Sequence, residues 1–200
     1  MSINKVLVLK SSMIQEEKSF SIHLLKKFLE YYKQKNPQDE IIELDLNDIP
    51  ISSKTLTVHN FNSFFNEEDS DKYINQLKEV NKVIIASPMT NFNYPASLKN
   101  YLDHILVANK TFSYKYTKKG EAKGLLPHLK VQLLTTQGAP FGWYPWGNHT
   151  EMLRGTWEFV GAQVVEPLLI AGTKVDYGQK TPIDAINDYD EKIKKAAELF

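Results

Sequence analysis

Five short apolar runs that alternate with segments of helical periodicity constrain the fold of this chain more than any other feature. The clearest run covers residues 82–86, KVIIA, a β-branched stretch typical of a strand that is buried on both faces. At residues 87–95 it gives way to a turn with two prolines and two asparagines, and apolar residues then recur at helical spacing over residues 96–108. A strand, a turn and a helix in this order form the unit with which α/β proteins hold ligands beyond the carboxyl ends of parallel strands.

The same alternation along the rest of the chain predicts an α/β fold. The sequence predicts strands over residues 5–10, 40–46, 82–86, 130–136 and 164–171. It predicts helices over residues 67–80, 96–108 and 149–161, from Ser19 or Ser21 to Lys35, and from Pro182 to Phe200. Pro167 favours an edge position for the last strand. No linker or repeat divides the sequence, so residues 1–200 are expected to form one domain, a three-layer sandwich.

Two segments do not fit this alternation. Residues 51–66 lack periodicity and carry three phenylalanines, so they either pack over an edge of the sheet or belong to a partner surface. Residues 110–116 alternate polar and aromatic side chains and then meet a turn rich in lysine and glycine, which favours a small hairpin. We interpret the basic run 115–123 as a solvated part of this hairpin rather than as a nucleic-acid patch.

Composition excludes several classes of function. The 24 basic and 24 acidic residues cancel, so no net field attracts nucleic acid or an anionic membrane. The chain has no cysteine, which excludes disulfides, thiolate metal sites and cysteine nucleophiles. No apolar run approaches the ~20 residues of a membrane span. The first five residues show no signal-peptide pattern, so we expect a cytoplasmic protein.

The placement of glycine restricts how the chain can bind a phosphate. All 9 glycines lie at or after Gly120, which rules out a Walker loop or a dinucleotide fingerprint after an early strand. A phosphate near the N-terminus would therefore need hydroxyls and backbone amides. Four serines, at positions 11, 12, 19 and 21, surround the point where the first helix begins. The alternative is that one serine caps the helix and the others are solvated.

Two further loops should converge with this serine loop at one edge of the sheet. Residues 87–95 combine the amides of Asn91 and Asn93 with the apolar surface of Met89 and Phe92, and a flavin ring needs both. The alternative is a rigid turn whose asparagines satisfy only backbone groups. The loop at 135–140 adds hydroxyls, an amide and a glycine that permits close backbone approach.

Sets of catalytic side chains are missing from the sequence. The five histidines show no metal-ligand spacing, so no metal site is expected, and a G-x-S-x-G nucleophile elbow is absent. Asp103 and His104 are adjacent on a helix and point in different directions, so they form no catalytic pair. Chemistry supplied by a cofactor is therefore the simplest interpretation.

The chain resembles the FMN-dependent NADH azoreductases, the bacterial flavodoxin-like NADH:quinone oxidoreductases, over essentially its whole length. The resemblance rests on KVLVLKSS at residues 5–12, SPMTNFN at 87–93, LKNYLD at 98–103 and TFSY at 111–114. It implies a flavodoxin-like sandwich with a five-stranded parallel sheet, order 2-1-3-4-5, and helices on both faces. It also implies an FMN site formed by Ser12, Ser19, Phe20, Ser21, Met89, Thr90, Asn91, Phe92, Thr136, Gln137, Gly138 and Ala139.

This resemblance implies a homodimer with active sites at the interface and a two-step reaction. NADH passes a hydride to FMN and leaves, and a quinone or an aromatic azo compound then takes two electrons at the same site. Phe112 and Phe159 are candidates for an aromatic wall, one of them from the partner subunit. The loop that bears Trp143, Tyr144 and Trp146 departs from the family pattern and is expected to shape the substrate pocket. Thr90 and Ala139 also depart, because the family commonly has tyrosine and glycine there.

Two other functions remain open at this point. A flavodoxin-like electron carrier would bind FMN but have no substrate of its own, although carriers are usually smaller and acidic. A regulatory α/β domain would bind no flavin at all.

Overall fold

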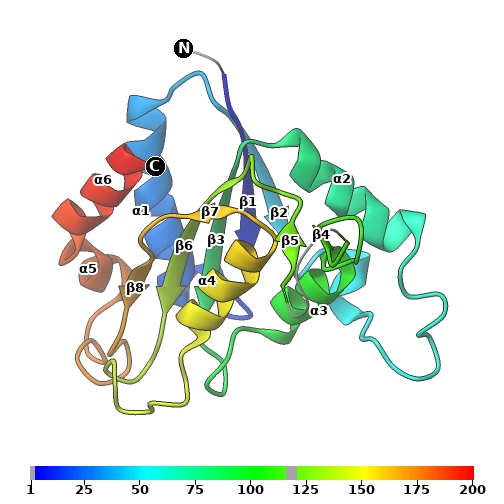
Figure 1. Cartoon of the computed structure of the whole chain (residues 1–200). Helices are drawn as coiled ribbons and strands as arrows, with labels where there is room; N and C mark the ends of the chain where they lie inside the picture. Colours follow the sequence, from blue (N-terminus) through cyan, green and yellow to red (C-terminus); the bar gives the residue numbers. More distant parts are fainter. Residues whose placement is uncertain (1–2, 116–120) are drawn as a thin grey trace.

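A computed structural model of the chain describes residues 3–115 and 121–200 and shows a parallel sheet between two layers of helices (Figure 1). The sheet has the order β2-β1-β3-β6, with two short strands, β7 and β8, both paired to the outer side of β6. All of these pairs are parallel. The strands are β1 (Lys5–Lys10), β2 (Glu40–Asp45), β3 (Lys82–Pro88), β6 (Lys130–Thr136), β7 (Gln163–Val164) and β8 (Leu168–Ile170). This is the predicted order of a flavodoxin-like sheet.

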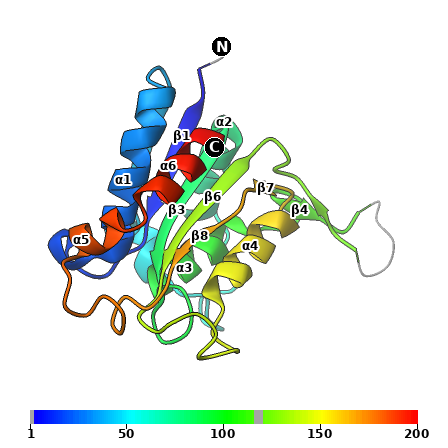
Figure 2. The ribbon, with the colours of Figure 1, turned by 90° about the vertical axis from the view of Figure 1, so that its left-hand side faces the viewer.

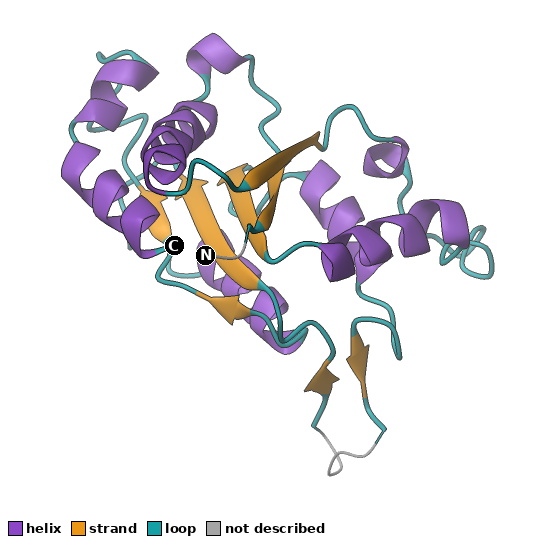
Figure 3. Cartoon of the chain, turned by 90° about the horizontal axis from the view of Figure 1, so that it is seen from above, coloured by secondary structure: helices purple, strands orange, loops and turns teal. Residues whose placement is uncertain are grey.

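Helices cover both faces of the sheet because each central strand sends alternate side chains to opposite sides. Val6 and Val8 of β1 join one core cluster, whereas Leu7 and Leu9 join the other. The first cluster is covered by α1 (Phe20–Lys35), α5 (Pro182–Asn187) and α6 (Asp190–Leu199). The second is covered by α2 (Lys72–Glu79), α3 (Ala96–Ile105) and α4 (His149–Phe159). Figures 2 and 3 show the sheet between these two sets.

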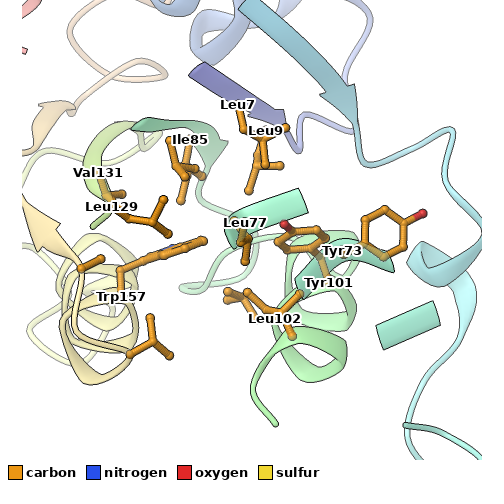
Figure 4. Close-up of a cluster of buried hydrophobic side chains, with 14 of the residues drawn as sticks. Leu7, Leu9, Tyr73, Leu77, Ile85, Tyr101, Leu102, Leu129, Val131 and Trp157 are labelled. Atoms are coloured by element: carbon orange, nitrogen blue, oxygen red, sulfur yellow. The ribbon is translucent and has the colours of Figure 1, made fainter. Parts of the chain in front are cut away.

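The second cluster is built around large side chains from all three of its helices. Trp157 of α4 and Tyr101 of α3 are fully buried, and Tyr73 of α2 lies edge-on to Tyr101 with ring centroids 5.8 Å apart. Figure 4 shows these rings packed beneath Leu7 and Ile85 of the central strands. Burial of a large apolar side chain is worth roughly 1.5–3 kcal/mol, so these rings help to hold α2, α3 and α4 against the sheet.

The central strands agree with the sequence, and the predicted boundaries differ at several ends. β3 continues two residues beyond the prediction, to Pro88, because it remains paired with β6 there. The predicted strand 164–171 is interrupted at Pro167, which lacks the N–H that a ladder needs. The predicted final helix is two helices, α5 and α6, with Asp188 and Tyr189 between them.

Two other helices also differ from the prediction. α3 ends at Ile105 rather than at residue 108, since the Thr111 hydroxyl donates to the Ile105 carbonyl at 2.7 Å and the chain turns at Asn109, with φ 65°. The predicted helix 67–80 starts with one π-helical stretch, Glu67–Asp71, before α2. The helix predicted over 149–161 ends at Phe159.

The two irregular segments have short ordered pieces. Within residues 51–66, a 3₁₀ turn at Pro50–Ser53 is followed by a loop in which Phe64 is buried and Phe61 is exposed. The predicted hairpin pairs β4 (Phe112–Ser113) with β5 (Lys123–Gly124) in antiparallel fashion. Its connecting turn, with most of the basic run, includes residues 116–120, which lie outside the described residues. No helix within residues 3–115 and 121–200 is long and apolar enough to cross a membrane.

Candidate functional site

The loops that follow β1, β3 and β6 meet at the carboxyl edge of the sheet, the lower edge in Figure 1. The amide of Ser11 donates to the Ala86 carbonyl at 3.1 Å, and the amide of Met89 donates to the Thr136 carbonyl at 2.7 Å. These bonds extend the pairing of the strands into the loops. The three segments that the sequence singled out are therefore neighbours in space.

A chain of buried serine hydroxyls lies at the N-terminus of α1. Ser19 is the N-cap, and its Oγ accepts a hydrogen bond from the Ile22 amide at 3.4 Å. The same Oγ lies 2.7 Å from Ser12 Oγ and 3.2 Å from Ser21 Oγ. The amides of Phe20 and Ser21, at the first helical positions, have no partner within the helix, and the helix dipole is positive there. Hydroxyl and amide donors are thus gathered at one helix end, where the cap group Ser19 Oγ also contacts the two other serines.

The turn after β3 has a strained and exposed tip. Thr90 and Asn93 exchange two backbone hydrogen bonds, of 2.6 and 3.0 Å, around Asn91 and Phe92. Both tip residues have positive φ, 47° for Asn91 and 70° for Phe92, which is the geometry of a type I′ turn. Asparagine tolerates this conformation, whereas a bulky aromatic residue rarely adopts it. The first loop also reaches the turn, since Met13 Sδ lies 3.7 Å from the Thr90 hydroxyl.

Two aromatic rings from the loop after β6 lie against Phe92 at the tip of this turn. Phe92 lies 5.1 Å from Tyr144 and 5.8 Å from Trp146, measured between ring centroids. Gly147 lies against Phe92, and a Cβ at position 147 would be 3.1 Å from Phe92 Cβ. The long loop after β6 is therefore packed on the turn after β3. Trp143, which the sequence predicted to line the substrate pocket, is exposed, and its ring contacts no described aromatic ring.

The loop after β6 is held rigidly by the loop after β8. Thr136 and Gln137 are buried, and the carbonyls of Gln137, Gly138 and Ala139 accept hydrogen bonds from backbone amides of residues 172–174. The Gln137 side chain donates to the Ala139 carbonyl at 2.9 Å. The backbone at 136–139 is thus fixed, and the amide group of Gln137 is used within its own loop.

His149 is a site neighbour that sequence reasoning missed. Asn148 caps α4 by accepting from the Glu151 amide at 3.2 Å, which places His149 first in the helix at the carboxyl edge of the sheet. Burial lowers the pKa of His149 from 6.5 to about 4. A hydrogen bond to the Ser87 backbone raises this pKa but offsets only part of the effect of burial. Its Nε2 is buried and has no partner in the described chain. The Asn148–Glu151 spacing is a cap signature that could have located this residue.

Phe112 and Phe159 lie together but away from these loops. Their ring centroids are 4.9 Å apart, and Phe159 is 40% exposed. Phe159 ends α4 whereas His149 begins it, so the two are separated by about 15 Å at 1.5 Å per residue. The structure therefore brings the two predicted wall residues to each other, at a distance from the turn after β3.

The residues at the edge fit a phosphorylated aromatic cofactor better than a metal. The described residues contain no group of three or more His, Asp or Glu side chains placed to hold a metal ion. The serine hydroxyls and helix amides offer donors to a phosphate. The exposed turn and its aromatic neighbours offer apolar surface. The unpartnered Nε2 of His149 offers a polar group near them. These features match the donor set that FMN requires.

Comparisons with known proteins agree with this architecture. The chain is 60% identical over 197 residues to the FMN-dependent NADH:quinone oxidoreductase of Malacoplasma penetrans, covering 98% of this chain and 93% of that protein. It is 60% identical over 203 residues to the protein of the same name from Mycoplasma mobile, covering 100% of both chains. The crystal structure of an azoreductase from Bacillus anthracis superposes with a TM-score of 0.83 at 28% identity, covering 99% of this chain and 100% of that one. The model of the flavodoxin-like fold family matches residues 4–196, so the chain belongs to that family.

Proposed function

We propose that this protein is an FMN-dependent oxidoreductase that uses NADH to reduce quinones and aromatic azo compounds. The observation that carries the proposal is the set of buried serines at the N-terminus of α1, which lies beside the turn after β3. Relatives of 60% identity are named FMN-dependent NADH:quinone oxidoreductase, and azoreductase structures of 27% and 28% identity share the fold. The balanced reaction is NADH + H⁺ + quinone giving NAD⁺ and hydroquinone.

The serine loop would hold the phosphate of FMN. Ser12, Ser19 and Ser21 can turn their hydroxyl protons from one another to phosphate oxygens, and the Phe20 and Ser21 amides point the same way. No lysine or arginine is needed, because the helix dipole and neutral donors suffice for such an anion. Ser19 would then both cap the helix and bind the ligand.

The two other loops would hold the isoalloxazine ring. Residues 89–92 present backbone groups and the Asn91 amide at the exposed tip, and residues 136–139 form a rigid floor fixed by the β8 loop. Met89 and Phe92 supply apolar contact. Thr90 offers less surface than the tyrosine common in the family, and its hydroxyl is directed to Met13 instead.

The side chains of the site bind and orient, and the cofactor provides the redox chemistry. Bound FMN would supply the chemistry of hydride transfer from NADH and of two-electron reduction of the acceptor. His149 stays neutral at physiological pH, since burial lowers its pKa to about 4, so its bare ring nitrogen can accept a hydrogen bond without adding charge. Planar reactants need only a flat apolar slot, and we therefore expect broad acceptor specificity.

We also propose a homodimer in which each subunit completes the partner's site, in the cytoplasm where NADH is used as a coenzyme. The support is the Phe112–Phe159 pair, which is partly exposed and too far from its own turn to line it. In a two-fold dimer such a pair can reach the turn of the other subunit. Phe112 and Phe159 would then form a wall of the partner's slot.

Steady-state oxidation of NADH tests the proposed activity. Protein loaded with FMN should consume NADH in the presence of 1,4-naphthoquinone. Double-reciprocal plots of initial rate against NADH concentration, at several fixed quinone concentrations, should give parallel lines. A protein that binds FMN but turns over no quinone would be an electron carrier. A protein that takes up no FMN would be a domain with another ligand.

A further inference from the structure

We propose that Tyr144 and Trp146, acting with Phe92, select the electron acceptor by stacking against extended planar molecules. This inference rests on the function proposed above and assigns acceptor selection to a loop after β6. The three rings contact one another, since Tyr144 and Trp146 also lie 5.4 Å apart at 59°. The ring planes of Tyr144 and Trp146 are inclined to the Phe92 ring by 69° and 58°. Because no two of these rings are stacked face to face, their faces can stack against another planar molecule.

The three side chains are exposed at the turn after β3. Trp146 is 70% exposed, Phe92 43% and Tyr144 39%. Phe92 directly follows Asn91 at the tip of the turn, so a reactant that approaches this turn meets the aromatic cluster. Exposed aromatic groups that are kept together on a surface are typical of a binding surface rather than of a core.

The cluster is held in place before any ligand arrives. Phe92 adopts φ 70°, a conformation that persists only where the surroundings enforce it, and Gly147 packs directly against it. The amide of Gly147 donates to the Tyr144 carbonyl at 2.9 Å, which closes a turn that contains Trp146. A preformed surface loses little conformational entropy on binding. Most of the favourable free energy of ring stacking therefore contributes to affinity.

The loop has no charge with which to attract an ionic acceptor. Residues 139–147, APFGWYPWG, contain no acidic or basic side chain. A bicyclic quinone gains stacking area on such a surface, a monocyclic quinone gains less, and an inorganic anion such as ferricyanide gains none. The ratio of activities with these acceptors therefore measures how much the aromatic cluster contributes to acceptor binding.

The test compares Trp146→Leu and Tyr144→Leu with Phe141→Leu. Phe141 lies on the same loop and is 67% exposed, but its ring contacts no described aromatic ring, so it is the matched control. With saturating NADH, kcat/KM is measured for 1,4-naphthoquinone, 1,4-benzoquinone and ferricyanide. We expect the naphthoquinone-to-ferricyanide ratio to fall about fivefold, mainly through KM, in the first two variants. The ratio should be the same in Phe141→Leu as in wild type.

An unchanged ratio in Trp146→Leu and Tyr144→Leu, although wild type reduces naphthoquinone, would overturn the inference while the proposed function stands. If these variants also self-associate more weakly in sedimentation experiments, the cluster belongs to a subunit interface. Wild-type protein that reduces none of the three acceptors would instead overturn the proposed function, and the inference with it.

Discussion

Phe92 connects the two loops that matter most in this structure. A bulky residue at φ 70° costs of order 1–3 kcal/mol in backbone strain. The contacts with Tyr144 and Trp146 offset part of that cost, and Gly147 leaves room for the Phe92 ring. The tip of the turn is therefore rigid because aromatic packing enforces it, although the tip is exposed.

Gly147→Ala should disturb this packing. The new Cβ would lie 3.1 Å from Phe92 Cβ and 3.3 Å from Phe92 Cδ1, so we expect a loss of about 1–3 kcal/mol in the free energy of unfolding. Gly155→Ala is the control, because its Cβ would meet nothing within 4 Å and alanine favours the helix by roughly 1 kcal/mol. Urea denaturation measures both. Equal effects of the two substitutions would contradict the assigned contact.

His149 should make stability depend on pH above the range of the carboxylates. Its pKa is 6.5 when exposed and about 4 in the fold, so below pH 6.5 the unfolded chain takes up a proton that the native chain does not. The stability from this group is complete above pH 6.5 and falls as the pH falls. We expect a loss of about 2 kcal/mol between about pH 7 and pH 5, at 1.36 kcal/mol per unit.

His149→Gln should remove this loss from urea denaturation curves at the two pH values. Asp39 and Asp69 also have shifted pKa values, but both are lowered from 3.8 and therefore contribute only at more acidic pH. If the variant loses as much free energy of unfolding between pH 7 and pH 5 as wild type does, another group causes the loss.

At the scale of elements, substitution can separate the capping role of the α1 N-terminus from its proposed role in phosphate binding. Ser19→Ala removes the cap and should cost about 1 kcal/mol of stability, and it should also weaken FMN binding about tenfold through the lost phosphate bond. Thr181 caps α5 by accepting from the Asp184 amide at 3.2 Å, far along the chain from the serine loop. Thr181→Ala should cost similar stability but leave FMN affinity unchanged.

Fluorescence titration with FMN and with riboflavin measures this difference. The tenfold loss in Ser19→Ala should occur with FMN and be absent with riboflavin, which has no phosphate. An equal loss with both ligands would place the phosphate elsewhere.

The sequence predicted the central elements well because their signals are local. β1 and β6 match their predicted bounds, since unbroken apolar runs identify buried strands. The end of α3 could not be foreseen, because it depends on the Thr111 hydroxyl reaching back to Ile105. Pro167 correctly predicted that the last strand lies at an edge of the sheet. The division of that strand into β7 and β8 was not predicted.

The candidate site was predicted in part. The serine loop, the turn and the loop at 136–139 converge as the alternation of strands and helices requires. The contacts of Tyr144 and Trp146 with Phe92, and the burial of His149, are tertiary features that no periodicity encodes. The roles of all these residues in binding remain predictions.

At the scale of the whole molecule, the proposed sharing of sites between two subunits predicts complementation between variants. Ser19→Ala would damage the site of its own subunit, whereas Phe159→Ala would damage the site of the partner. In mixed dimers one site carries both changes and the other none, so refolding an equal mixture should leave about a quarter of all sites intact. Quinone reductase activity of the mixture should then exceed that of either variant alone. Activity no higher than the average of the two variants would argue for sites within single subunits.

The most direct test of the central claim is the visible absorption spectrum of the purified protein mixed with FMN and then, without oxygen, with NADH. We predict that one FMN per chain remains after desalting and that its absorption bands bleach on addition of one equivalent of NADH. They should return when 1,4-naphthoquinone is added. A protein that retains no FMN, or whose bound FMN does not bleach with NADH, would contradict the account.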